Sequence, residues 1–182
     1  MENAITISGL IKSEKTINNK EKLLLIAIIR ISGTADLLPV RVKKAQIENI
    51  DKKQFVLVNG LIESRYIYQR TCVQVQALQI LNIHQPMYLN AVVLRGALKN
   101  VSYYCRESGM QVNNMALSVG RNIIPCVAWY DNADILNTNV GTQFKIIGRF
   151  QSRDYIKNGT KKTFYEVAIK NVEEIRHEEN IA

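Results

Sequence analysis

Cysteine, proline, tryptophan and histidine are all scarce in this chain of 182 residues, which has three Cys, three Pro, one Trp and two His. The cysteines, Cys72, Cys105 and Cys126, are far apart and form no CxxC pair, which argues against a disulfide framework and a zinc site and favours a reducing compartment. The histidines, His84 and His177, stand beside no Cys, Ser or carboxylate pair in a catalytic frame. The sequence therefore predicts a protein that is not an enzyme and needs no metal or cofactor.

Long apolar runs are scarce too. The longest, LLLIAII at residues 23–29, is too short to span a bilayer and is typical of a buried strand. The N-terminal MENAITISG is acidic and polar, unlike a signal peptide. We therefore expect a soluble cytoplasmic protein that does not act at a membrane.

The charge is mainly of one sign, because 24 Lys and Arg stand against 16 Asp and Glu, a formal net charge of +8. Residues 1–88 hold 12 basic and 7 acidic residues, and residues 89–182 hold 12 and 9, so both halves are positive. This balance indicates a polyanionic partner such as nucleic acid, although a mildly basic surface is also common in proteins that bind no polyanion.

Alternating apolar residues dominate the chain and run through an internal repeat of about 87 residues. "ITISGLIKS" at 5–13 matches "VVLRGALKN" at 92–100, and "LLPVRVKKAQIENI" at 37–50 matches "IIPCVAWYDNADIL" at 123–136. "QFVLVNGLIESRY" at 54–66 matches "QFKIIGRFQSRDY" at 143–155, with one residue fewer before the glycine. Two domains of one design are therefore expected, at residues 1–83 and 89–175, followed by a short acidic tail at 176–182.

Each repeat has the pattern of three strands, a short helix (43–49 and 131–138) and two more strands. Gly9 and Gly96 fall in the middle of the first strands, where they predict a sharp bend or bulge that lets a small barrel close. This order is that of the OB-fold, a five-stranded Greek-key barrel with a helix between strands 3 and 4. The sequence thus predicts an all-β protein of two tandem OB-folds.

Alternation also assigns the two faces of each first strand. The inner face is formed by Ile5, Ile7, Ile11, Val92, Leu94 and Leu98. The outer face presents the polar residues Ser8, Lys12, Arg95 and Lys99 and the apolar or small positions Thr6, Leu10, Val93 and Ala97. Two-fold pairing of two chains would cover these outward positions, and the alternative is that the two domains of one chain cover each other.

The single tryptophan, Trp129, occupies the position that Lys43 holds in the first repeat. Arg41 and Lys43 face outward, because Arg and Lys are almost never buried unpaired. The same register turns Ile124, Cys126 and Ala128 inward and Val127 and Trp129 outward. Trp129 is then either a surface on which a base stacks or a packing residue at a domain or subunit interface.

In "GRFQSRDY", the residues Arg149, Arg153 and Tyr155 share one parity and face outward with Trp129. Phe150 has the other parity and is expected in the core, because its counterpart is Ile62. Cations that follow phosphates and flat rings that stack on bases are what a single-stranded nucleic acid needs, at about 1–3 kcal/mol per stacked base. The alternative is a set of solvated arginines.

Most of residues 89–175 resembles the bacterial single-stranded DNA-binding protein family. The matching segments are "VVLRGALKN", "SGMQVNNMALSVGR", "IPCVAWYDNADIL", "GTQFKIIGRFQSRDY" and "TFYEVAIKNVEEI", in family order and spacing, and the first repeat resembles the family only in outline. The resemblance implies an OB-fold protein that wraps single-stranded DNA without strong sequence preference, in replication, repair and recombination, in the nucleoid. It also implies four OB domains, here as a homodimer of two-domain chains.

The resemblance implies a set of site residues. The family's stacking aromatics correspond to Trp129 and Tyr155, and its phosphate contacts correspond to Arg95, Arg121, Arg149 and Arg153. Further candidates for the nucleic-acid surface are Lys99, Arg106, Arg41, Lys43, Arg65 and Tyr66. The first repeat has Lys43 in place of Trp129 and Ile67 in place of Tyr155, so it keeps charge and loses stacking, which Tyr66 and Tyr68 would partly restore.

One departure from the family concerns the end of the chain. The family usually closes with an acidic tail and a terminal Pro-Phe that recruits replication or recombination enzymes, whereas this sequence ends in "HEENIA". This leaves room for a specialised paralogue, a mobile-element protein or a primosomal type. Two other functions stay open, namely an adaptor OB protein that binds other replication proteins and a single-stranded RNA binder.

Overall fold

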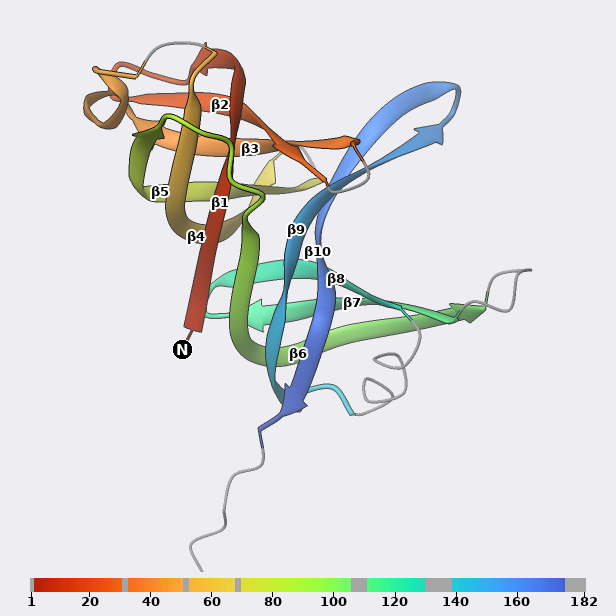
Figure 1. The fold of residues 1–182 in the computed structure, drawn as a ribbon. Helices are drawn as coiled ribbons and strands as arrows, with labels where there is room; N and C mark the ends of the chain where they lie inside the picture. The colour runs from red at the N-terminus through yellow and green to blue at the C-terminus, as the bar shows by residue number, and fades with distance from the viewer. Residues whose placement is uncertain are drawn as a thin grey trace, which may run out of the picture.

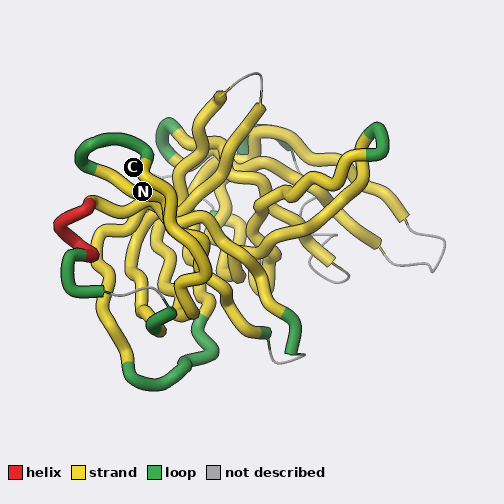
Figure 2. The backbone as a smooth tube through the Cα atoms, turned by 90° about the horizontal axis from the view of Figure 1, so that it is seen from above, coloured by secondary structure: helices red, strands yellow, loops and turns green. Residues whose placement is uncertain are grey.

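The computed structural model describes residues 2–30, 33–50, 53–67, 70–105, 111–129 and 139–175, and these residues form an all-β fold (Figures 1 and 2). The strands are β1 (Glu2–Thr16), β2 (Glu21–Ile29), β3 (Ala35–Lys43), β4 (Phe55–Ile67), β5 (Arg70–Ile83), β6 (Asn90–Cys105), β7 (Gln111–Val119), β8 (Asn122–Trp129), β9 (Gln143–Lys157) and β10 (Thr160–Glu174). Among the described residues, no helix is long and apolar enough to cross a membrane.

The strands close into two rings of five. In barrel 1, β1–β5 are hydrogen-bonded in the order β2-β3-β5-β4-β1, and β1 returns to β2. In barrel 2, β6–β10 repeat this order as β6-β7-β8-β10-β9, and β9 returns to β6. Figure 1 shows barrel 1 above barrel 2, with the far ends of β9 and β10 rising from barrel 2 beside barrel 1.

The expected helix at 43–49 is only a 3-10 helix, η1 (Lys44–Ile47), and the expected helix at 131–138 lies outside the described residues. The residue at the N-cap of η1 is Lys43, whose side chain makes no capping hydrogen bond, whereas α-helices favour Ser, Thr, Asp or Asn there. Ile50 N donates to Ile47 O, which keeps the following turn at 3-10 spacing. The prediction of a short helix is therefore reduced here to a single tight turn.

The predicted inner face of the first strands is correct, because all six of its side chains are buried in one main core that runs through both barrels. Phe150 and its counterpart Ile62 are also fully buried, as expected. Ser8 was expected on the outer face of β1, but it is not exposed to solvent. It points away from the core but is buried by the linker between the barrels, where its hydroxyl donates to Met87 O and its backbone N donates to Leu89 O at 2.8 Å.

Gly9 and Gly96 mark a close crossing of strands rather than a bulge. A Cβ on Gly96 would lie 2.2 Å from Ser118 O on β7, and a Cβ on Gly9 would lie 2.3 Å from Ala27 O on β2. The register shifts occur further along each strand, at 11/13 in β1 and 98/100 in β6. The glycines are therefore needed because another backbone passes where a side chain would be.

The sequence comparison predicted one residue fewer before the glycine in the fourth strand of the second repeat, and this prediction is wrong. Gly60 pairs with Ile5, and Gly148 pairs with the equivalent Val92. Val56 lies four residues before Gly60 and pairs with Gly9, and Phe144 lies four residues before Gly148 and pairs with the equivalent Gly96. The two strands therefore match without a gap, and the repeated letters "QF" are displaced by one residue because Phe144 takes the buried position of Val56.

The barrels are related by a pseudo-two-fold axis. Strands β1 and β6 pair antiparallel with each other, and Ile5 lies opposite Val92, its own equivalent. The outward positions Thr6 and Val93 lie in this ladder and are half-buried, so strand pairing within one chain covers part of the surface that was expected to need a second chain. The contact has the form of a self-complementary dimer interface made by a single chain.

Two hydrogen-bonded clamps flank this ladder. Ser152 of β9 donates to Asp36 of β3 through its backbone N at 2.9 Å and its hydroxyl at 3.1 Å. At the equivalent place, Ser64 N of β4 donates to Asn122 of β8 at 3.0 Å, and Ile123 N donates to the Ser64 hydroxyl at 2.7 Å. The pseudo-symmetry therefore extends to the side chains that join the barrels, with the exception that one clamp carries a carboxylate and the other an amide.

Candidate nucleic-acid interface

The tryptophan has the predicted register. Ile124, Cys126 and Ala128 are buried in the main core, and Trp129 lies on the opposite face of β8, where it is half-buried. Burial raises the pKa of the Cys126 thiol, so this cysteine stays a neutral core residue. Within the described ranges, no cluster of three His, Cys, Asp or Glu side chains is arranged to hold a metal ion.

Trp129 rests on a small apolar platform on the outside of barrel 2. Val112, Val127 and Ala168 form a buried cluster separate from the main core, and the Trp129 ring packs against it. Trp129 lies directly opposite Val112 on β7, and Val127 lies opposite Ala168 on β10. Residues of three neighbouring strands therefore form the platform on which Trp129 packs.

The equivalent place on barrel 1 is polar. By strand pairing, Glu21, Arg41, Gln76 and Lys43 take the positions of Val112, Val127, Ala168 and Trp129. The Arg41 guanidinium forms an ion pair with Glu21, and its side chain is only 12% exposed. Hydrogen bonds from Arg41 and Asn18 lower the pKa of Glu21, which keeps this carboxylate charged. Arg41 is therefore held by a side chain of its own barrel rather than presented to a ligand.

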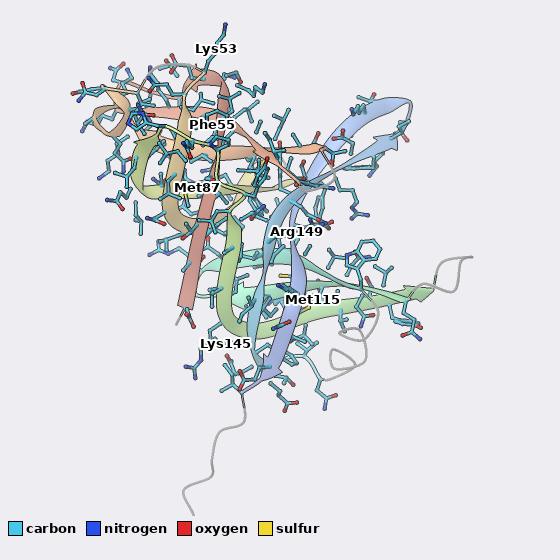
Figure 3. All side chains as sticks on the ribbon, in the orientation of Figure 1. Lys53, Phe55, Met87, Met115, Lys145 and Arg149 are labelled. Atoms are coloured by element: carbon cyan, nitrogen blue, oxygen red, sulfur yellow. The ribbon has the colours of Figure 1, made fainter. Side chains whose placement is uncertain are left out.

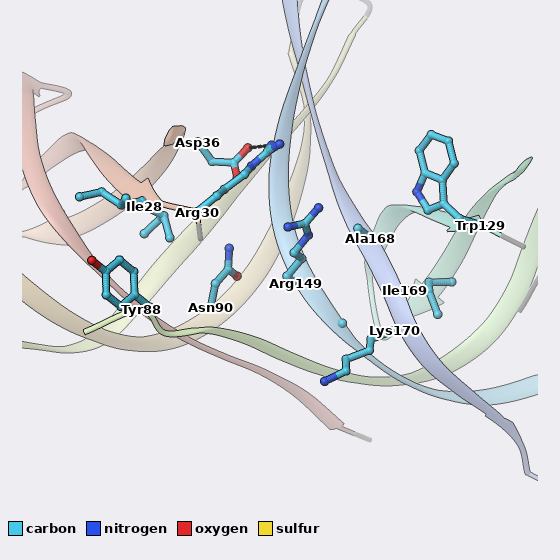
Figure 4. Close-up of a pocket in the computed structure, with 12 residues that line it drawn as sticks. Ile28, Arg30, Asp36, Tyr88, Asn90, Trp129, Arg149, Ala168, Ile169 and Lys170 are labelled. Atoms are coloured by element: carbon cyan, nitrogen blue, oxygen red, sulfur yellow. Dashed lines mark hydrogen bonds and ion pairs between the residues drawn. The ribbon is translucent and has the colours of Figure 1, made fainter. Parts of the chain in front are cut away.

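Trp129 lines an open cleft of about 720 Å³ at the seam between the two barrels, which we call the seam cleft (Figure 4). Its walls come from β2 and β3 of barrel 1, from the linker and from β6, β8, β9 and β10 of barrel 2. Its aromatic and charged lining residues are Trp129, Arg149, Lys170, Arg30, Asp36 and Tyr88.

The cations of the seam cleft differ in how they are held. The Arg30 Nε donates to Asp36 at 2.7 Å, so that charge is balanced inside the protein. Burial alone would raise the pKa of Asp36, but the Arg30 guanidinium and the Ser152 donors outweigh it, and the pKa lies below its ordinary value. Arg149 donates to the neutral amide of Gln151 at 3.3 Å and remains exposed, as does Lys170. The exposed positive charge of the cleft therefore comes from barrel 2.

Tyr155 lies elsewhere, although it shares the parity of Arg149. It is 42% exposed and lines a second hollow of about 820 Å³, which we call the arm groove, between the far ends of β9 and β10 and the outer face of barrel 1. The barrel 1 wall of this groove is mainly apolar and includes Leu23, Leu25 and Pro39. The expected single surface is thus divided, because Trp129 and Arg149 line the seam cleft and Tyr155 lines the arm groove.

Arg153 lines neither hollow and is engaged within the protein. Its Nε and one terminal nitrogen each approach the buried Glu166 at 3.3 Å, and its guanidinium lies 5.8 Å from the centre of the Phe164 ring. Gln151 also donates to Glu166, at 3.1 Å. Arg153 therefore neutralises a carboxylate that would otherwise be buried unpaired, a role that competes with a phosphate contact.

The remaining predicted residues are dispersed. Arg95 lines a separate hollow near the β7–β8 turn, and Lys99, Arg121 and Lys43 are exposed at other places on the surface. Arg65 forms an ion pair with Glu63 at 3.3 Å. Arg106 and Tyr68, and the side chain of Tyr66 on β4, lie outside the described residues.

The structure brings three cationic or aromatic residues into the seam cleft that the sequence alone did not indicate, namely Arg30, Tyr88 and Lys170. Arg30 follows a strand of the other barrel, Tyr88 belongs to the linker, and Lys170 lies at the register shift between Ile169 and Asn171 on β10. Simple alternation does not indicate Lys170, because the register changes at this residue. No pattern within a single repeat indicates Arg30 or Tyr88, because the contact that places them is between domains.

These features define an all-β protein of two tandem five-stranded barrels with a cationic, aromatic cleft at their seam. The structure is similar to that of the wild-type single-stranded DNA binding protein from Thermus aquaticus, with a TM-score of 0.78 and 19% sequence identity, over 97% of this chain and 94% of that one. A deletion variant of the same protein matches with a TM-score of 0.76 and 18% identity, over 97% and 95%. No protein-family model and no curated protein sequence matches the chain.

Proposed function

We propose that this chain is a non-enzymatic protein that binds single-stranded DNA without strong sequence preference. The observation that carries the proposal is the Trp129 ring, which is half-exposed on an apolar platform with the exposed cations Arg149 and Lys170 around the same cleft. The likeness of the fold to a protein named for binding single-stranded DNA supports it.

Each barrel is proposed to be an OB-fold. The supporting observation is the strand order 1-2-3-5-4-1, with one parallel pair between the third and fifth strands of each ring. The domain limits of residues 1–83 and 89–175 belong to this proposal, as does a tail at 176–182. OB-folds commonly bind oligonucleotides on their outer strand faces, and the Trp129 platform is on such a face.

The site suits a flexible polyanion with flat bases. An aromatic ring stacks on any base, which is worth about 1–3 kcal/mol, and Arg or Lys side chains hold the phosphates between stacked bases. Trp129 packs against the platform that includes Val127 and is half-exposed, so part of its ring is accessible to a base. Roles in replication, repair or recombination, and a cytoplasmic location in the nucleoid, are proposed on the same basis.

Changing Trp129 tests this function. Trp129→Ala should weaken binding of a labelled dT oligonucleotide by about 1–3 kcal/mol, and Trp129→Phe should restore most of it, both measured by fluorescence anisotropy. In the unaltered protein, poly(dT) should quench the fluorescence of this single tryptophan more than duplex DNA does. Stronger quenching by poly(U) would identify an RNA binder, and a fallen melting temperature with unchanged affinity would identify a packing residue.

We also propose that two chains associate to present four OB domains. Strands β5-β4-β1-β6-β9-β10 form a sheet that is continuous across both barrels, and its outer face exposes Leu81 and Ile147, at 43% and 39%. Leu81 lies opposite Leu57, and Ile147 lies opposite Val93, so the apolar positions adjoin within each barrel. Two-fold pairing would bury this face on both chains. Sedimentation equilibrium decides the matter, because a mass near 20.7 kDa would show a monomer.

A further inference from the structure

We propose that the seam cleft is one binding site for single-stranded DNA that both barrels and the linker build together, with Tyr88 as a second stacking aromatic across from Trp129. This inference rests on the proposed function and concerns where the strand passes. It assigns a ligand to a surface that neither barrel forms by itself.

Tyr88 combines strong exposure with a fixed backbone. Its side chain is 71% exposed, compared with 42% for Tyr155 in the arm groove. The residues on both sides of it are held by Ser8 of β1, which donates to Met87 O and, through its backbone N, to Leu89 O at 2.8 Å (Figure 3 shows Met87 in this linker). The ring is therefore presented to solvent by a backbone that is already ordered, which reduces the entropy lost on binding.

The position of Tyr88 in the cleft is complementary to that of Trp129. Figure 4 shows the Tyr88 and Trp129 rings toward opposite ends of the residues that line the cleft. Arg149 lies between them, and the Arg30–Asp36 pair lies on the barrel 1 side. A volume of about 720 Å³ lies within the range of roughly 300–1,000 Å³ that accommodates drug-sized ligands, which includes a nucleotide. A strand that crosses the cleft can place one base on each ring and a phosphate at Arg149.

The pseudo-symmetric place on the other side of the seam lacks these groups. There, Lys43 takes the position of Trp129, and Leu61, which follows Gly60, takes the position of Arg149, which follows the equivalent Gly148. Within the described part of the chain, the site is therefore present in one copy. The strand should accordingly engage one side of the seam, and the asymmetry gives the complex a defined orientation.

The test compares Tyr88→Ala with Tyr88→Phe and with Met87→Ala, a neighbour in the same linker that is 49% exposed and does not line the cleft. Affinity for a labelled 15-nucleotide dT strand is measured by anisotropy, with the melting temperature as a control for folding. Tyr88→Ala should weaken binding about 5- to 150-fold, from about 1–3 kcal/mol of lost stacking. Tyr88→Phe and Met87→Ala should bind within about twofold of the unaltered protein.

The tryptophan separates failure of this inference from failure of the proposed function. Poly(dT) should still quench Trp129 fluorescence in Tyr88→Ala, because the platform of barrel 2 is unchanged. Quenching with no loss of affinity in Tyr88→Ala, or an equal loss in Met87→Ala, would overturn the role of Tyr88 and leave the proposed function standing. Absence of quenching in the unaltered protein would overturn both.

Discussion

Barrel 1 and barrel 2 share their strand order, their core positions and the glycines at their strand crossings, but they differ in chemistry at one outer position. Barrel 1 has the Glu21–Arg41 ion pair there, and barrel 2 has Val112 and Val127 under a tryptophan. A flat ring needs an apolar surface beneath it, whereas the Lys43 ammonium stays hydrated above an ion pair. A few side chains therefore decide whether the same barrel presents a surface for stacking or a polar surface whose charges are paired with each other.

The largest effect should come from the feature that the barrels share. Gly96→Ala and Gly9→Ala should each lower the free energy of unfolding by about 3 kcal/mol, at the upper end of the cost of overpacking, because the new Cβ meets a backbone carbonyl oxygen. Urea unfolding measures this. Ala97→Gly, beside Gly96, is the control for strand flexibility and should cost about 0.5–1 kcal/mol. A loss at only one of the two glycines would show that the barrels are closed by different constraints.

The next prediction transfers the platform to barrel 1. The triple change Glu21→Val, Arg41→Val and Lys43→Trp removes the ion pair and supplies a supported ring, so it should strengthen binding of a long dT strand by about 1–3 kcal/mol. Lys43→Trp alone, above the intact ion pair, should gain less. A folded triple variant whose anisotropy titration matches the unaltered protein would show that the platform is insufficient without the rest of the seam cleft.

The two clamps should respond differently to acid. The pKa of Asp36 is lowered in the folded protein, so its stabilising contribution is present at neutral pH and is lost as the pH falls below about 4, where an unfolded Asp is protonated. Asp36→Asn should therefore cost about 1.5–3 kcal/mol at pH 7, the range of a hydrogen bond to a charged group, and less near pH 3. Asn122→Ala, in the equivalent clamp, should cost a similar amount at both pH values. Urea unfolding at the two pH values measures both differences, and a cost of Asp36→Asn independent of pH would contradict the assignment.

The smallest effect concerns phosphate contacts. Arg149→Ala should reduce the slope of log affinity against log salt by about 0.7, the value for one contact on a single strand. Arg153→Ala and Arg41→Ala should reduce it less, because these side chains are engaged by Glu166 and Glu21. Titrations at several salt concentrations measure the slopes. Equal slopes for Arg149→Ala and Arg41→Ala would mean that barrel 1 contacts the strand as much as barrel 2 does.

Local alternation was sufficient to predict the faces of single strands. It placed Ile124 inside and Trp129 outside correctly, because neighbouring side chains on a strand point to opposite faces whatever the rest of the chain does. The comparison of the two repeats was misled by the shared letters "QF", because the letters do not show that Phe144 fills the buried place of Val56. Alternation also did not distinguish among the outward arginines, because the acids that hold Arg41 and Arg153 are distant in the sequence or on another strand.

The all-β class, the two repeats, the inner faces of the strands and the outward tryptophan could be predicted, because they depend on residues that are near one another along the chain. Three features of the site could not: Trp129, Tyr88 and Arg149 share one cleft, Tyr155 lies in another, and Arg153 is held by Glu166. The physical reason is that the seam is formed by the pairing of β1 with β6 and by clamps between residues up to 116 positions apart. Such contacts depend on how the two completed barrels fit together, which no periodicity within one repeat encodes.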